Sequence, residues 1–150
     1  PKEVIEQINR LNVNMESCTT HFVQYAGLAG LNAPKNETQD IIDILRIRRD
    51  RLVKILNEID GIEAHSPEAG FYVFPKITKL LKNTGYDDVE EFRKAILNET
   101  GVSFCGRHHF GRPLNDEKDY YIRLAFSGIN IDDLEEGMAL FREWINNNTK

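Results

Sequence analysis

Arg123 is the residue whose type and position most directly suggest a chemical role. It interrupts the apolar run 120–126 (YYIRLAF), a composition typical of a β-strand. Because side chains alternate along a strand, Arg123 shares one face with Tyr121 and Ala125. Two interpretations are open: the guanidinium faces solvent, or it lies in a pocket and binds a carboxylate through its planar pair of N–H donors.

A second candidate region is the glycine-bounded loop 106–113 (GRHHFGRP). Glycines allow a backbone to pass close to a ligand, but no helix follows this loop, as a phosphate cradle would require. The adjacent His108 and His109 are residue types that bind metals. Neighbouring side chains are expected to diverge, and no third ligand lies at a suitable spacing, so the sequence predicts no metal site.

The cysteines, the net charge and the length of the apolar runs exclude several classes of protein. Cys18 and Cys105 lie far apart and are typical of reduced thiols in a cytoplasmic protein, with Cys105 expected to be a packed thiol rather than a nucleophile. The 150 residues carry 24 acidic and 19 basic side chains, a net charge of -5, which argues against binding to nucleic acid or to an anionic membrane. No apolar run approaches the roughly 20 residues that cross a bilayer.

The elements that position these residues follow from the spacing of apolar side chains. Helical spacing predicts helices at 4–11, 22–31, 36–59, 88–97 and 132–145. Branched and aromatic runs predict strands at 62–65, 71–74, 102–104 and 120–126. Beyond about Ala33 this order predicts an α+β fold, with a short and mostly antiparallel sheet packed on helices in two layers. The first two predicted helices, 4–11 and 22–31, are then part of another structural unit and not of this fold.

Local signals add detail to this expectation. Turn residues between 62–65 and 71–74 predict an antiparallel hairpin, and 80–87 is expected to be a connection. Asp132, with Glu135 three residues later, is expected to form a capping box at the start of the last helix.

Two further patterns concern surfaces and ends. The arginines of 36–59 are open to two interpretations, a polyanion site or a solvated helix face with intrahelical ion pairs, and the second is favoured. Pro1 leads directly into a helical pattern, whereas a natural N-terminus usually carries an irregular lead. We therefore expect a fragment or a processed product.

Three stretches resemble, in the same order, the C-terminal half of class I/II (fold-type I) aminotransferases, which use pyridoxal phosphate. The stretches are 68–75 (EAGFYVFP), 101–111 (GVSFCGRHHFG) and 121–127 (YIRLAFS). Aspartate aminotransferases of the prokaryotic and archaeal kind are the most similar. The opening 1–5 resembles the segment just after the lysine motif of that family, and 17–31 resembles the last part of its large domain.

The resemblance implies a role for Arg123. The family places there the arginine that binds the substrate α-carboxylate, which favours the pocket over solvent. Gly106, Phe110 and Gly111 match the small-domain loop at the mouth of the family's active site. Cys105 stands where the family usually has a proline, which leaves the rigidity of this loop open.

The resemblance also implies a domain division and a weaker set of site residues. Residues 1–33 would be the C-terminal remnant of the large cofactor-binding domain, and 34–150 the small domain. Ser17, Thr19 and Thr20 match a segment at the family's dimer interface that can approach the cofactor of the partner. The usual proline of that segment is missing here.

The family's Schiff-base lysine lies in a Ser-x-x-Lys motif expected shortly before Pro1, and Lys2, Lys76 and Lys94 do not match it. The chain by itself is therefore expected to hold no catalytic residue and to be inactive. Its parent would be a cytoplasmic homodimer that moves an amino group between an amino acid, aspartate or an aromatic one, and a 2-oxo acid. The alternatives are a fragment of another fold-type I enzyme, such as a β-lyase, or a free-standing non-catalytic domain that binds carboxylates or mediates assembly.

Overall fold

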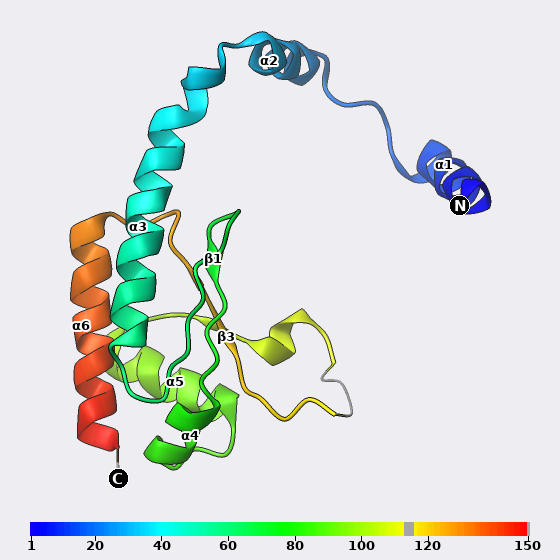
Figure 1. Ribbon diagram of the computed structural model, residues 1–150. Coiled ribbons are helices and arrows are strands. Elements are labelled where there is room, and N and C mark those ends of the chain that lie inside the picture. The colour runs from blue at the N-terminus through cyan, green and yellow to red at the C-terminus, as the bar shows by residue number, and fades with distance from the viewer. Residues whose placement is uncertain (113–115, 150) are drawn as a thin grey trace. The chain divides into compact units, whose positions relative to one another are not determined.

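The computed structural model describes residues 1–112 and 116–149, and it contains two compact units, Pro1–Gln39 and Asp40–Lys150 (Figure 1). Each unit is described by itself. The first contains α1 (Lys2–Met15), α2 (His21–Asn32) and a short 3₁₀ helix, η1 (Lys35–Thr38).

The helices of the first unit bury no residue. Helix α1 is longer than the expected 4–11, because residues 12–15 (NVNM) continue the helix as far as Met15. Val13, Phe22 and Leu31 are 82%, 73% and 87% exposed. Exposed apolar surface of this kind usually marks a contact surface. We therefore expect the apolar faces of these helices to pack against another surface.

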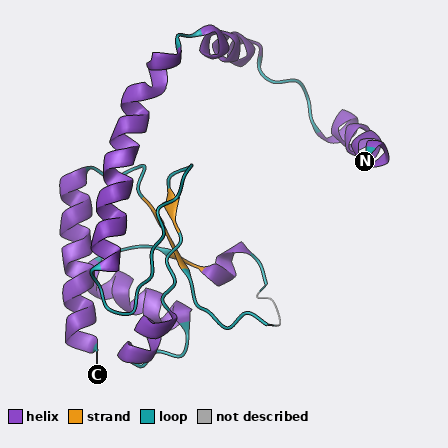
Figure 2. Cartoon of the chain, in the orientation of Figure 1, coloured by secondary structure: helices purple, strands orange, loops and turns teal. Residues whose placement is uncertain are grey.

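The second unit combines helices with a small sheet (Figure 2). Its helices are α3 (Gln39–Asn57), α4 (Thr78–Thr84), α5 (Val89–Thr100), the 3₁₀ helix η2 (Arg107–Phe110) and α6 (Ile131–Asn148). Its strands are β1 (Tyr72–Val73), β2 (Cys105–Gly106) and β3 (Ile122–Ala125). Helices α3 and α6 lie side by side, on one side of the strands (Figures 1 and 2).

Strand β3 is the centre of the sheet, whose order is β1-β3-β2. Both neighbours pair with it in antiparallel fashion, Val73 opposite Leu124 on one side and Cys105 opposite Arg123 on the other. The expected α+β class, with a short antiparallel sheet packed on helices, is confirmed.

The core lies between the sheet and the helices and is rich in aromatic side chains. Phe92 of α5 is fully buried, and its ring contacts Trp144 of α6 edge-on, with centroids 5.8 Å apart. Helical spacing in 132–145 predicts an apolar inner face, and these side chains of α6 are indeed buried: Leu134, Met138, Phe141 and Ile145. Helix α6 therefore contributes one continuous apolar stripe to the core.

Two expectations about chain pairing and connection are wrong. Residues 62–65 make only an isolated antiparallel bridge, Glu63 with Lys76, while β1 pairs with β3, about 50 residues later in the chain. The expected connection 80–87 is mostly helix α4, whose Leu80 and Leu81 are buried. Burial of these two leucines stabilises a helix too short to show a clear periodic pattern.

The start of the last helix also differs from the prediction. Asn130, rather than Asp132, is the N-cap residue of α6, and its side-chain oxygen accepts a hydrogen bond of 2.8 Å from the backbone N–H of Asp133. Asp88 is the N-cap residue of α5, since its carboxylate accepts a 3.0 Å hydrogen bond from the N–H of Glu90. Among the described residues, none of the helices combines the length and hydropathy that a membrane span requires.

Gly61 should tolerate alanine less well than Gly101, although both have positive φ angles, +87° and +74°. A Cβ atom on Gly61 would lie 2.7 Å from the backbone nitrogen of Leu80, whereas nothing lies within 4 Å of one on Gly101. We expect Gly101→Ala to cost about 1–2 kcal/mol of unfolding free energy from backbone strain alone, and Gly61→Ala to cost more. Urea denaturation measures both, and equal losses would contradict this account of Gly61.

Asp119 should make the stability of the second unit depend on pH. Its carboxylate lies 3.1 Å from Lys76 Nζ and accepts a 3.0 Å hydrogen bond from the hydroxyl of Thr78. The hydrogen bond and charge of Lys76 lower the pKa of Asp119 below its usual 3.8. A lowered pKa gives stability that is present above the unfolded pKa and is lost as pH falls through the folded value.

Asp119→Asn should therefore lower the thermal midpoint at pH 7, and the gap from the unaltered protein should close as the pH falls well below 3.8. Thermal melts across this range test the expectation. A gap of constant size at all pH values would mean that the carboxylate contributes no charge-dependent stability.

Candidate functional site

The outer face of the sheet carries the candidate site. Along β3, Ile122 and Leu124 point into the core and are buried, while Arg123 between them is half-buried on the other face. The alternation predicted from the sequence is confirmed for these residues. The arginine is therefore held at the centre of the sheet by the burial of its two neighbours.

Two aromatic rings pack against the guanidinium of Arg123. Its Cζ atom lies 4.2 Å from the ring centroid of Tyr72 and 4.2 Å from that of Phe110. Contacts of this type attract a cation to the face of a ring and leave the N–H donors at the edge of the guanidinium. Within the described residues, the side chain of Arg123 has no hydrogen bond or ion pair. Its donor edge is therefore available to a ligand.

Tyr72 is a site residue that the sequence did not reveal. It lies on β1 next to the buried Val73, so its ring points to the outer face that Arg123 shares. On the same face Phe74 stacks on Tyr121, with centroids 5.3 Å apart and planes 4° from parallel. The alternating aromatic residues of 71–74 were a signal for an exposed aromatic face. The pairing of β1 with β3, which brings Tyr72 to Arg123, was not predictable from local pattern.

The structure brings the predicted mouth residues Gly106 and Phe110 to Arg123. Gly106 is buried on β2 opposite Ile122, one residue after Cys105, which pairs with Arg123. Helix η2 starts directly after it and ends at Phe110, whose ring contacts the guanidinium. Gly106 also has no room for a side chain, because a Cβ atom there would lie 2.7 Å from the His108 ring.

Arg107 holds this loop in place. Its Nη1 donates a 3.1 Å hydrogen bond to the carbonyl of Gly111, the third predicted mouth residue, and its Nη2 lies 3.0 Å from a carboxylate oxygen of Glu117. The backbone N–H of Arg107 donates to the carbonyl of Tyr121 on the neighbouring strand. The loop that carries Phe110 is thus fixed to the strand that carries Arg123.

Ser17, Thr19 and Thr20 lie in the first unit, in the exposed segment between α1 and α2. The carbonyl of Thr19 accepts a 2.7 Å hydrogen bond from the side-chain amide of Gln24. These three residues and the Arg123 face belong to different units, so their predicted role near a cofactor stays a prediction.

None of the three lysines Lys2, Lys76 and Lys94 fits a covalent cofactor site. A Schiff base requires an amine that can lose its proton readily. The hydrogen bond and charge of Asp119 instead raise the pKa of Lys76 and hold it as an ammonium group. Lys2 and Lys94 are 87% and 62% exposed, and each lies within 4 Å of a glutamate carboxylate.

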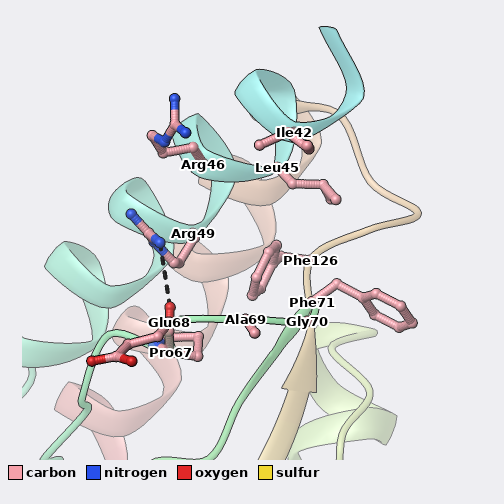
Figure 3. Close-up of a pocket in the computed structure, with 10 residues that line it drawn as sticks. All are labelled: Ile42, Leu45, Arg46, Arg49, Pro67, Glu68, Ala69, Gly70, Phe71 and Phe126. Carbon is pink, nitrogen blue, oxygen red and sulfur yellow. Dashed lines mark hydrogen bonds between the residues drawn. The ribbon is translucent and has the colours of Figure 1, made fainter. Parts of the chain in front are cut away.

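Two arginines of α3, Arg46 and Arg49, line a cavity of about 340 Å³ beside the turn 67–70 (Figure 3). Arg46 pairs with Asp43 at 2.7 Å within the helix, as the solvated-face interpretation expects. Arg49 likewise pairs with Asp50 of the same helix at 2.7 Å, and it also donates a 3.3 Å hydrogen bond to the carbonyl of Pro67. Two others leave the helix as well, because Arg48 donates to the Ser127 carbonyl and Arg51 pairs with Glu135 of α6. These arginines connect α3 to neighbouring segments of the chain. None of their contacts indicates a polyanion site.

Comparison with known proteins gives a consistent result. No family model matches the chain. Aspartate aminotransferases from Sulfurisphaera tokodaii and Bacillus subtilis are 31% and 28% identical to it over 144 residues, which are 96% of this chain and 35% of each of those proteins. The chain thus spans about a third of the length of these curated relatives.

Solved structures agree with the sequence comparison. The alanine aminotransferase from Pyrococcus furiosus is 29% identical, with a TM-score of 0.78, over 97% of this chain and 34% of that one. The aspartate aminotransferase from Rhizobium meliloti, at 21% identity, shares the fold with a TM-score of 0.79 over 100% of this chain and 37% of that one. Over nearly its whole length the chain is therefore similar, in sequence and in fold, to the C-terminal segment of fold-type I aminotransferases of the aspartate aminotransferase type.

Proposed function

We propose that this chain is the C-terminal part of a pyridoxal-phosphate-dependent aminotransferase that moves an amino group between an amino acid and a 2-oxo acid. In this proposal residues 34–150 are the small domain, and 1–33 are the end of the large domain. One observation carries it: Arg123, with Tyr72 and Phe110 packed on its guanidinium, has a donor edge that no described residue occupies.

Arg123 would bind the α-carboxylate of the substrate. A planar guanidinium and a planar carboxylate form two parallel N–H···O hydrogen bonds, which fix both the position and the rotation of the carboxylate. Holding the carboxylate in this way places the substrate Cα for proton abstraction. Tyr72 and Phe110 would keep the guanidinium in one orientation before the substrate arrives, which lowers the entropy lost on binding.

The cofactor supplies the electron sink of the reaction in this family. Since Lys76 is held as an ammonium group and Lys2 and Lys94 are exposed, we assign the Schiff-base lysine to a part of the longer protein that precedes residue 1 in the family's arrangement. Ser17, Thr19 and Thr20 are assigned, by resemblance only, to the segment that approaches the cofactor of a partner subunit.

Aspartate or an aromatic amino acid is the proposed amino donor. The names of the relatives, which include aspartate aminotransferase and aspartate/prephenate aminotransferase, support aspartate, and the aromatic alternative rests on the resemblance alone. A cytoplasmic homodimer belongs to the same proposal, and the free thiols Cys18 and Cys105 are consistent with a reducing compartment.

A second candidate, an assembly domain without catalysis, is favoured by the apolar surface of the chain. Ile41 and Ile47 in the first half of α3 are 59% and 61% exposed, although the sequence places Ile41 on the apolar face of that helix. Together with the open faces of α1 and α2, they need a covering surface. A large domain of the same protein or another partner would each supply it, and the kinetics of Arg123→Ala described below test the first case.

Arg123→Ala in the longer protein should raise KM and lower kcat/KM for every amino-acid substrate alike. The expected loss in kcat/KM is at least tenfold, because a hydrogen bond to a charged group contributes roughly 1.5–3 kcal/mol. Steady-state kinetics with aspartate and with an aromatic amino acid measure it. Arg46→Ala, which removes an exposed arginine paired with Asp43, is the control and should leave both constants unchanged. Unchanged kinetics in Arg123→Ala would end the proposed role.

The chain of residues 1–150 should form no specific covalent adduct with pyridoxal phosphate. We expect borohydride reduction of the mixture, followed by intact-mass measurement, to show no stoichiometric addition, because the chain holds no Ser-x-x-Lys motif and Asp119 holds Lys76 as an ammonium group. The longer protein, treated in the same way, should gain one cofactor per chain. A stoichiometric adduct on the 1–150 chain would show that its own lysine suffices.

A further inference from the structure

Three ligand-type side chains meet beside the loop that carries Phe110. Nε2 of His108 lies 3.4 Å from Oε2 of Glu90, and Nε2 of His109 lies 4.0 Å from the same oxygen. One ligand atom from each residue lies within 4.8 Å of the other two. Glu90 is in the first turn of α5, and the two histidines are in η2.

This arrangement differs from the sequence-based expectation. The side chains of His108 and His109 do not diverge, because η2 turns the backbone tightly and brings the two ring centroids to 4.1 Å. The third residue comes from α5, 18 and 19 positions earlier in the chain. Neither feature follows from the spacing of residues in the loop.

Contacts behind the rings hold the histidines in place. Nδ1 of His109 lies 3.2 Å from the carbonyl oxygen of Gly106. A hydrogen bond there places the proton on Nδ1 and leaves the Nε2 lone pair facing Glu90, which is the usual support of a metal-binding histidine. The ring of His108 packs against Gly106, where a side chain would not fit.

We propose that Glu90, His108 and His109 form a binding site for a divalent transition-metal ion, with Zn²⁺ the best match. Two imidazoles and one carboxylate are a common ligand set for zinc, with a water molecule in the fourth position. Zinc bonds of about 2.0–2.1 Å in a tetrahedron require ligand atoms roughly 3.3 Å apart. The distances of 3.4 and 4.0 Å need only small side-chain rotations to reach this value.

The charges around Glu90 limit how tightly the site binds. Arg93 contacts both carboxylate oxygens, at 2.8 and 2.7 Å, and Lys94 Nζ lies 3.7 Å away. The hydrogen bonds and charge of Arg93 lower the pKa of Glu90 to about 2, so the carboxylate is ionised at neutral pH. Each carboxylate oxygen has two lone pairs, so Oε2 can accept from Arg93 and still bind an ion. The two positive charges repel the ion and weaken its binding.

An ion at this site would connect η2 to α5. The ligands come from two elements that are separate in the chain, so binding would stabilise their packing by mass action. This proposal does not rest on the proposed aminotransferase activity, because all three ligand residues lie within the second unit.

Titration of the 1–150 chain with Zn²⁺ at pH 7.5 tests the proposal. Calorimetry should show one ion per chain, and Zn²⁺ should raise the thermal midpoint. Co²⁺ in place of Zn²⁺ should give the visible absorption bands of a tetrahedral nitrogen and oxygen site. His108→Ala, His109→Ala and Glu90→Gln should each lower the affinity at least tenfold, in line with the effects of perturbing metal ligands.

His65→Ala and Cys18→Ser are the matched controls, because each removes an exposed imidazole or thiol outside the cluster. Both should change the affinity less than twofold. Circular dichroism without metal establishes that each variant is folded, and an unfolded alanine variant is replaced by His108→Gln or His109→Gln. Zn²⁺ affinity that survives in folded variants of both histidines, or the absence of binding by the unaltered chain, would overturn the proposal.

Discussion

The central strand β3 has to bury two neighbouring side chains and present a charged one between them. Ile122 and Leu124 are part of the core, so the pleat of the strand directs Arg123 to the opposite face. A shift of the strand by one residue would exchange these positions and bury the guanidinium without a partner, at a cost of several kcal/mol. The apolar core therefore fixes the register of the sheet, and the register fixes the candidate site.

Arg123 is partly buried although no carboxylate among residues 1–112 and 116–149 pairs with it. An ion pair within the protein would satisfy the guanidinium and close its donor edge to other molecules. Tyr72 and Phe110 contribute attraction through their ring faces instead, at 4.2 Å each, and use none of its N–H donors. The neighbouring strand and the loop η2 each supply one of these rings. The site consequently depends on the antiparallel pairing on both sides of β3, and neither ring alone defines it.

Local sequence pattern was sufficient to predict some elements of this structure and insufficient to predict the others. The alternation of β3 and the apolar stripe of α6 were predictable, because both follow from periods of two and of 3.6 residues within one element. Tyr72 and Glu90 were not recognised as site residues, since their partners lie about 50 and 18 residues away and pair only in the folded chain. Helix α4 was missed because burial of Leu80 and Leu81, rather than helical periodicity, stabilises it.

The backbone around Gly106 links the two candidate sites of the second unit. Its carbonyl contacts His109, its missing side chain leaves room for His108, and its neighbour Cys105 pairs with Arg123. One residue beyond His109, the ring of Phe110 covers the guanidinium. Helix η2 is stabilised by the Arg107–Glu117 pair, and an ion bound with Glu90 would stabilise it further. Each of these interactions therefore also fixes the ring of Phe110, which positions Arg123. The two sites share the segment 106–110, so coupling between them requires no larger motion of the domain.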